Sequence, residues 1–109
     1  MTTRIIGTGS SIPNRKVTND DLAKIMDTSD EWIYSRTGIH SRHLVEQETT
    51  TGMASDAAQK AMENAGVSPE EIDLIIVGTV SGDMCYPSTA CLVQAKIGAV
   101  NAVAYDISA

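Results

Sequence analysis

An aromatic ring and a cation lie one helical turn apart in the stretch TSDEWIYSRTGI. Trp32 is the only tryptophan of the chain, with Thr28 four residues before it and Arg36 four residues after it. Residues spaced in this way lie along one face of a helix. An indole, a guanidinium and the hydroxyls of Thr28, Ser35 and Thr37 offer a purine with an attached phosphate a stacking surface, a charge and hydrogen-bond donors. The alternative is that Trp32 is partly buried and anchors its helix to the fold, because an indole buries a large area.

The basic side chains cluster around the end of this stretch. The cluster consists of Arg36, His40, Arg42 and His43, with Arg15 and Lys16 upstream. The two histidines have three interpretations: solvated loop residues, donors to a phosphate, or metal ligands. Because no third ligand is in view, we expect no metal site.

The two cysteines, Cys85 and Cys91, lack the paired close spacing of a zinc site. Free cysteines are among the most often buried residues, so we expect both to be small apolar side chains in the interior. No nucleophile in the chain has a convincing base, since the histidines are far in sequence from these thiols and from the serines. Sequence distance alone excludes little, because catalytic triads assemble in space.

Tyr86 heads the segment YPSTA, after a loop that follows an apolar stretch. Pro87 restricts the turn and the ring has a polar tip. A place in the core and a contact with a pocket or a partner are both compatible with this position.

Composition indicates one globular unit, residues 1–109, with a core of aliphatic residues. The chain has 109 residues, of which 42% are hydrophobic, and it contains no phenylalanine. Its net charge of −6 argues against general nucleic-acid binding, which depends on attraction to phosphates. No apolar run reaches the ~20 residues of a membrane span, and no secretory leader follows Met1, so we expect a soluble cytoplasmic protein.

Periodicity and capping signals predict an α/β fold with a largely parallel sheet covered by helices. We expect strands at 4–9, 73–80 and 102–108. One helix is predicted to follow a Thr18 cap, and another to begin at Thr28, in a capping box with Glu31, and to end before Gly38. Further helices are predicted over 51–65, ended by Gly66, after a Ser68 cap, and from a Ser88 cap through Ile97, ended by Gly98. The apolar segment 73–80 does not alternate, which predicts burial on both faces. Gly7 and Gly9 do not form a dinucleotide-binding loop, because position 12 is isoleucine.

The chain resembles the β-ketoacyl-acyl carrier protein synthase III family of bacterial fatty-acid synthesis. The motifs that carry the resemblance are IIGTGSSIP, DTSDEWIYSRTGIHSRH, YPSTACLVQ and AYDISA. The resemblance implies a thiolase-like fold of two α/β halves in a homodimer, with this chain as most of the first half. It also implies transfer of an acyl group from acyl-CoA, acetyl-CoA in the first instance, to a cysteine, and condensation with malonyl-acyl carrier protein. No separate cofactor is implied, since the coenzyme A thioester is the substrate.

The resemblance also implies roles for individual residues. Trp32 matches the tryptophan that stacks on the adenine of coenzyme A, and Thr28 matches a hydroxyl near that adenine. Arg36 and Thr37 match polar contacts near the nucleotide phosphate. Tyr86 matches a position, usually aromatic, that reaches across the dimer into the acyl pocket of the partner.

The family's catalytic residues are not in this sequence. The nucleophilic cysteine is expected just after Ala109, with the histidine and asparagine further on, so we expect the 109 residues alone to be inactive. Two alternatives stay open. One is a non-catalytic module that binds coenzyme A or completes a partner subunit, and the other is a related condensing enzyme of secondary metabolism.

Overall fold

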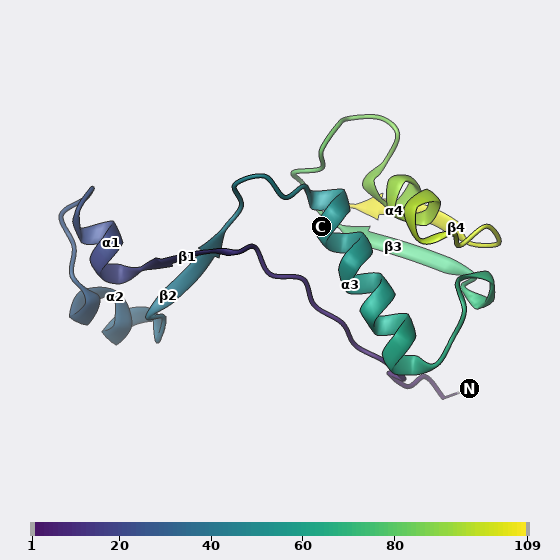
Figure 1. The fold of residues 1–109 in the computed structure, drawn as a ribbon, viewed down its shortest axis with the longest axis horizontal. Coiled ribbons are helices and arrows are strands. Elements are labelled where there is room, and N and C mark those ends of the chain that lie inside the picture. The colour runs from purple at the N-terminus through teal and green to yellow at the C-terminus, as the bar shows by residue number, and fades with distance from the viewer. Residues whose placement is uncertain (1, 109) are drawn as a thin grey trace. The chain divides into compact units, whose positions relative to one another are not determined.

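The computed structural model describes residues 2–108 of the chain. They form two compact units, a smaller one of Ile12–Gln47 and a larger one of Met1–Ser11 with Glu48–Ala109 (Figure 1). The elements in chain order are β1 (Arg15–Thr18), α1 (Asn19–Ala23), α2 (Asp30–Thr37), β2 (Ser41–Leu44), α3 (Thr50–Ala65), the 3₁₀ helix η1 (Pro69–Glu71), β3 (Leu74–Gly78), α4 (Thr89–Ile97) and β4 (Val103–Ile107).

The larger unit consists of a parallel strand pair packed against helices. Strands β3 and β4 are parallel, with Leu74 opposite Val103 and Gly78 opposite Ile107. Helix α4 packs on both strands and α3 packs on α4 (Figure 1). The buried core consists of Val93, Ile97, Ala99 and Ala102. The predicted strands at 73–80 and 102–108 and the parallel pairing are confirmed.

Only one face of this strand pair is covered by the described residues. Ile75 and Val77 point towards the core, whereas Leu74 and Ile76 are 50% and 47% exposed. The residues of β4 alternate in the same way, and Val103 is 64% exposed. The prediction that segment 73–80 is buried on both faces is therefore wrong for this chain, because the helices that contact the strands leave their alternate residues open.

The helix boundaries of the larger unit follow their capping residues. Thr49 caps α3 and Ser88 caps α4, each through its side-chain oxygen. The left-handed glycines Gly66 and Gly98 end these helices. The boundaries predicted for both helices are confirmed within one residue.

The predicted strand at 4–9 is absent from the structure. No ladder forms there, and the segment approaches α3 so closely that a Cβ atom on Gly7 or Gly9 would collide with the helix backbone at Ala61 or Ala57. A strand needs a second strand for its backbone hydrogen bonds, and no strand among residues 2–108 pairs with this segment, whose Thr8 amide donates to the side chain of Asn64 instead. The two glycines therefore serve close packing on a helix.

The smaller unit is built around a buried polar side chain. Strands β1 and β2 pair antiparallel, with Arg15 opposite Leu44 and Thr18 opposite Ser41. Asn19 is 1% exposed and its amide nitrogen donates to Asp30 Oδ1 and to the carbonyl of Ile39, both at 2.7 Å. These bonds join the start of α1 to the first residue of α2 and to Ile39, which follows the Gly38 cap of that helix. Sequence reasoning missed the strand pair, whereas the predicted Thr18 cap of α1 is confirmed.

Candidate functional site

Helix α2, which carries Trp32 and Arg36, begins two residues later than predicted. Its N-cap is Ser29, whose hydroxyl accepts a hydrogen bond from the amide of Trp32 at 3.1 Å. Its end before Gly38 is confirmed, and Gly38 adopts φ 70°. The capping box predicted for Thr28 and Glu31 is wrong, because Ser29 is equally able to cap and stands one position nearer the helix. Thr28 therefore lies outside the helix and does not continue the face of Trp32.

Trp32 and Arg36 form one exposed unit on α2. The guanidinium carbon of Arg36 lies 4.4 Å from the centroid of the Trp32 ring, and the indole is 55% exposed. Arg36 Nη1 also donates to the carbonyl of Trp32 at 3.4 Å. At an exposed site, such a cation–π contact contributes about 0.5–1 kcal/mol of attraction between the two side chains. Trp32 is therefore not a core anchor, and the alternative of an accessible aromatic surface is favoured.

A shallow depression of about 270 Å³ lies against this pair. Ser29, Glu31, Trp32, Ser35 and Arg36 line it. The depression combines an aromatic face, a guanidinium, two hydroxyls and one carboxylate. Sequence reasoning missed Ser29 and Glu31 as lining residues, and the i, i+3 and i, i+4 spacing from Trp32 and Ser35 was the signal that could have found them.

The two threonines predicted for this site are engaged differently. Thr28 Oγ1 is buried, and no described residue forms a hydrogen bond with it. The Thr37 hydroxyl donates to the carbonyl of Ile33 at 2.8 Å and accepts from the amide of Ile39 at 3.1 Å. Thr37 thus stabilises the end of α2, and its single hydroxyl proton is already donated to the Ile33 carbonyl.

The histidines and Arg42 of the basic cluster have structural partners. The His40 ring stacks on Tyr34 with 3.9 Å between centroids, and its Nδ1 lies 3.4 Å from Asp30 Oδ1. His43 Nδ1 lies 2.6 Å from the carbonyl oxygen of Pro13. Since a carbonyl oxygen only accepts, this nitrogen carries the proton.

Arg42 continues the polar network around Asn19. Its Nη2 donates to Asn19 Oδ1 at 2.7 Å and its Nη1 to the carbonyl of Val17 at 3.3 Å. At the other side of the network, the amide of Asn19 and then the ring of His40 lower the pKa of Asp30 below its ordinary value. The network fixes α2 on the strand pair and leaves the outer face of the helix open.

Tyr86 lies in the loop of residues 79–88, between β3 and α4. Its side chain is 89% exposed, and the peptide bond between Tyr86 and Pro87 is cis. Tyr86 is therefore not core filler within the described chain, which leaves the contact with a pocket or partner. Cys85, its neighbour, is also exposed, so the prediction that both cysteines are buried is wrong for Cys85, whereas Cys91 is half-buried.

Two aspartates accept hydrogen bonds from the first backbone amides of α3 and α4. Asp83 accepts from the amides of Thr50 and Thr51, both at 2.8 Å, at the start of α3. Asp106 accepts from the amides of Thr89 and Ala90, both at 2.7 Å, at the start of α4. Sequence reasoning found neither contact, since they join residues 16 to 33 positions apart.

The pKa values of both carboxyls are lowered by their surroundings. The Thr51 side chain contributes most to the lowered pKa of Asp83, followed by the amides of Thr51 and Thr50. The Thr51 hydroxyl is buried and forms no hydrogen bond with residues 2–108, so we attribute its effect on the pKa to its dipole. For Asp106, partial burial raises the pKa, but bonds from Ala90 and Thr89 outweigh that effect and the net shift is downward.

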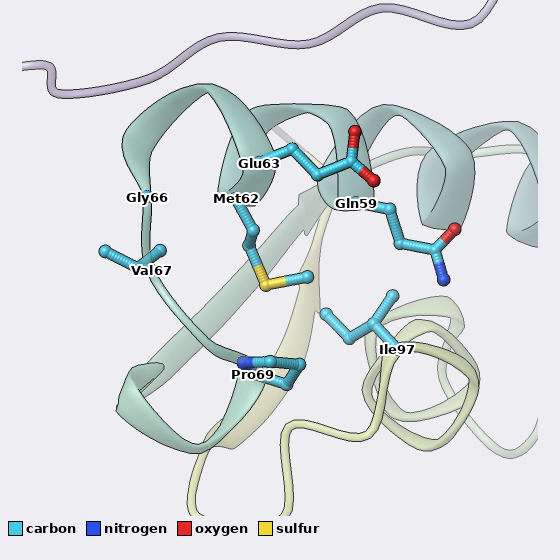
Figure 2. Close-up of a pocket in the computed structure, with 7 residues that line it drawn as sticks. All are labelled: Gln59, Met62, Glu63, Gly66, Val67, Pro69 and Ile97. Carbon is cyan, nitrogen blue, oxygen red and sulfur yellow. The ribbon is translucent and has the colours of Figure 1, made fainter.

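A second and larger depression, of about 400 Å³, belongs to the larger unit (Figure 2). In Figure 2, Met62 and Ile97 face one another across it, with Glu63 and Gln59 at its rim. It contains none of the predicted site residues and no basic side chain. We therefore assign the candidate site to the Trp32 depression and not to the larger hollow.

Residues 2–108 contain neither a candidate metal site nor a candidate membrane span. No three side chains of His, Cys, Asp or Glu come together in a way that would hold a metal ion. No helix in this range has the length and apolar character needed to cross a membrane.

The family of the chain follows from its similarity to known proteins. No protein-family model matches it. It is 57% identical over 107 residues to β-ketoacyl-[acyl-carrier-protein] synthase III of Xanthomonas euvesicatoria, covering 97% of the chain and 33% of that protein. The synthase of the same name from Aquifex aeolicus is 54% identical over 109 residues, which is 35% of its length.

Solved structures agree with these relatives. The crystal structure of 3-oxoacyl-[acyl-carrier-protein] synthase III from Aquifex aeolicus matches 99% of the chain and 35% of its own, with a TM-score of 0.95 and 54% identity. A priming β-ketosynthase of a polyketide biosynthetic pathway matches 97% of the chain and 32% of its own, with a TM-score of 0.93 and 40% identity. Over the third of the relatives' length that it spans, the chain belongs to the β-ketoacyl-[acyl-carrier-protein] synthase III family and has its thiolase-like fold.

Proposed function

We propose that the chain forms the coenzyme entrance of an acyltransferase that condenses an acyl-CoA, acetyl-CoA in the first instance, with malonyl-acyl carrier protein. This reaction would initiate fatty-acid synthesis. The observation that carries the proposal is the exposed Trp32–Arg36 pair, which lies in a chain 57% identical to a β-ketoacyl-[acyl-carrier-protein] synthase III.

The proposed chemistry is covalent catalysis by a cysteine thiolate. The thiolate attacks the thioester carbonyl, coenzyme A leaves as a thiolate, and an acyl-cysteine remains. Loss of carbon dioxide from the malonyl group gives a carbanion, which attacks that thioester, forms a carbon–carbon bond and frees the cysteine. Oxyanion donors stabilise both tetrahedral intermediates. From the family resemblance we expect this cysteine just after Ala109, outside the described residues, and we therefore expect the chain alone to be inactive.

The role proposed for α2 is to hold the nucleotide end of coenzyme A. Arg36 covers one face of the indole at 4.4 Å, so the adenine takes the face that Arg36 leaves open. Four of the five N–H groups of the guanidinium make no bond to the described residues and are suited to a nearby phosphate. One turn of α2 thus presents both an aromatic surface for stacking and a positive charge for a phosphate.

The roles proposed for the two threonines are weaker than that of the pair. Contact between Thr28 and the adenine requires rotation of its side chain, since Oγ1 is buried. Thr37 cannot donate to a phosphate while its proton is bound to Ile33. We therefore propose Trp32 and Arg36 as the principal contacts, with Thr28 and Thr37 as secondary ones.

The rest of the proposal concerns the assembled enzyme. It acts as a cytoplasmic homodimer, in which Tyr86 reaches into the acyl pocket of the partner subunit. Its 89% exposure is compatible with such a contact. Coenzyme A enters as part of the substrate, and no separate cofactor takes part.

Replacement of Trp32 tests the coenzyme entrance. In the complete enzyme, Trp32→Ala is expected to raise KM for acyl-CoA about 5- to 150-fold, which corresponds to the ~1–3 kcal/mol of base stacking, with little change in kcat. Ile25→Ala removes a 77% exposed aliphatic side chain of the same unit and serves as the control. Unchanged acyl-CoA kinetics in Trp32→Ala would exclude the stacking role.

Mass spectrometry of the complete enzyme tests the reaction class. Incubation with acetyl-CoA is expected to add one acetyl group to the cysteine that follows Ala109. Absence of the adduct with every acyl-CoA would favour a non-catalytic module. An adduct formed only with longer or branched acyl groups would favour the secondary-metabolite alternative, which the 40% identity to a priming β-ketosynthase supports.

A further inference from the structure

The 79–88 loop, which carries Tyr86, has few apolar contacts to hold it in place. Val80 and Tyr86 are 86% and 89% exposed, and Met84 and Cys85 are also exposed. A loop without buried side chains opens at a lower cost in free energy than the core of a fold does. Its conformation must therefore depend on polar anchors.

Asp83 is the strongest of these anchors. Its two carboxylate oxygens accept from the amides of Thr50 and Thr51 at 2.8 Å, at the positive end of α3. The Thr50 hydroxyl returns a bond to the carbonyl of Ser81 at 3.1 Å. Charge-assisted bonds of this kind are about twice as strong as neutral ones.

Helix α3 already has a cap of its own. Thr49 Oγ1 accepts from the amide of Gly52 at 2.9 Å, as an N-cap residue does. Asp83 supplies acceptors for the two remaining first-turn amides, and it does so from the loop, more than 30 residues away in sequence. The contact therefore fixes the loop on the helix and is not a local requirement of helix formation.

The loop also passes close to the start of α4. A Cβ atom on Gly82 would lie 2.6 Å from Thr89 Oγ1, so the backbone at Gly82 passes directly over the start of α4. Asp106 binds the amides of Thr89 and Ala90 there. The loop is thus bound to the start of α3 and passes close to the start of α4, and Tyr86 lies in the sequence between Asp83 and the Ser88 cap of α4.

We propose that Asp83 is a positioning residue that holds the 79–88 loop on α3 and thereby fixes where Tyr86 meets the acyl group. The effect on acyl selectivity rests on the proposed function, whereas the attachment of the loop does not. Loss of Asp83 would free the loop, let Tyr86 adopt several positions, and weaken discrimination between acyl chains of different length.

Two measurements on the complete enzyme test this proposal. The first is amide hydrogen exchange, in which Asp83→Ala is expected to speed exchange of the Thr50 and Thr51 amides and of the loop about tenfold or more, with residues 54–65 unchanged. The second is kcat/KM for acetyl-CoA relative to a longer acyl-CoA, a ratio expected to move about tenfold towards equal use of both.

Matched variants separate positioning from general damage. Asp83→Asn keeps one acceptor oxygen and is expected to fall between the wild type and Asp83→Ala in both measurements. Asp73→Asn, at an exposed aspartate outside the loop, is expected to change neither.

The outcomes distinguish the two proposals. A loosened loop with unchanged acyl selectivity would overturn the positioning role, and so would altered selectivity with unchanged exchange. If the wild-type enzyme accepts no acyl-CoA, the proposed function fails, and with it the selectivity role, while the exchange result still decides whether Asp83 attaches the loop.

Discussion

The two units of the molecule are stabilised by different interactions. The larger unit is centred on apolar side chains, among them Val93 and Ile97, which are 2% and 8% exposed. The smaller unit is centred on Asn19, at 1% exposure, and its bonds to Asp30 and Arg42. The unit that presents the proposed ligand face is thus specified by hydrogen-bond geometry, which fixes directions, whereas the other is specified by packing, which fixes volumes.

The largest effect is expected in the apolar core of the larger unit. Ile97→Ala should lower the free energy of unfolding by about 2–5 kcal/mol, because it removes buried methylene groups and leaves a cavity. Urea unfolding measures this loss through its midpoint. Val100→Ala, at a 76% exposed position of the same unit, should stay within about 0.5 kcal/mol of the wild type. Equal effects of the two changes would contradict the packing assigned to α4.

The next effect concerns the polar centre of the smaller unit. Asn19→Ala leaves the Ile39 carbonyl and an N–H of Arg42 without their Asn19 partner, and leaves Asp30 Oδ1 with the longer contact to His40, at a cost of about 1–3 kcal/mol. Hydrogen exchange should accelerate in residues 12–47 and not in 48–108.

A matched amide in the larger unit supplies the control. Asn101→Ala removes a single exposed bond to the carbonyl of Glu70 and should have little effect. Faster exchange throughout both units in Asn19→Ala would show that the units unfold together, which would remove the contrast between them.

A smaller effect decides which residue caps α2. Ser29→Ala should destabilise the smaller unit by about 1 kcal/mol, since it removes the acceptor for the Trp32 amide. Thr28→Ala should have the smaller effect, because its hydroxyl has no partner among the described residues. The urea midpoints of the two variants give the comparison, and the reverse order would restore the capping box predicted for Thr28.

The smallest effect is a dependence on pH in the larger unit. The folded-state pKa values of Asp83 and Asp106 lie below the unfolded value of about 3.9, so each carboxylate contributes stability that is present above that pH. This contribution is lost as pH falls through the folded-state values. The variant with Asp83→Asn and Asp106→Asn should show a weaker fall in unfolding midpoint below about pH 4. A slope identical to that of the wild type would contradict the two contacts.

The sequence was most informative where structure depends on local chemistry. The ends of α2, α3 and α4 at Gly38, Gly66 and Gly98 were predicted correctly, because a left-handed residue after a helix favours glycine. The caps at Thr18 and Ser88 were also predicted. The parallel pair followed from two apolar runs separated by a helix.

The errors arose where two distant segments decide the outcome. Strands β1 and β2 are four residues each, with Val17 and Leu44 as their aliphatic residues, so neither has a detectable period. The segment 4–9 has strand composition but no strand to pair with among residues 2–108. The exposure of Cys85 follows from a loop held by Asp83, a contact that no local pattern indicates.

The candidate site was predicted in part, for the same reasons. Trp32 and Arg36 were brought together by helical spacing, and the structure confirms their contact. Thr28 was wrongly placed on the same face because two neighbouring hydroxyl residues compete for one cap position. The use of the Thr37 proton by Ile33 depends on a side-chain rotamer, which the sequence does not encode in any simple pattern.

The close approach of Gly7 and Gly9 to α3 bears on which substitutions the N-terminal segment tolerates. Each Cβ would collide with backbone atoms of a helix, and backbone cannot move aside as the tip of a long side chain does. A saturation library at these two positions should therefore return glycine almost alone among folded variants. Thr8, which lies between them in the sequence, binds Asn64 through its backbone amide, so its side chain should accept replacement far more freely.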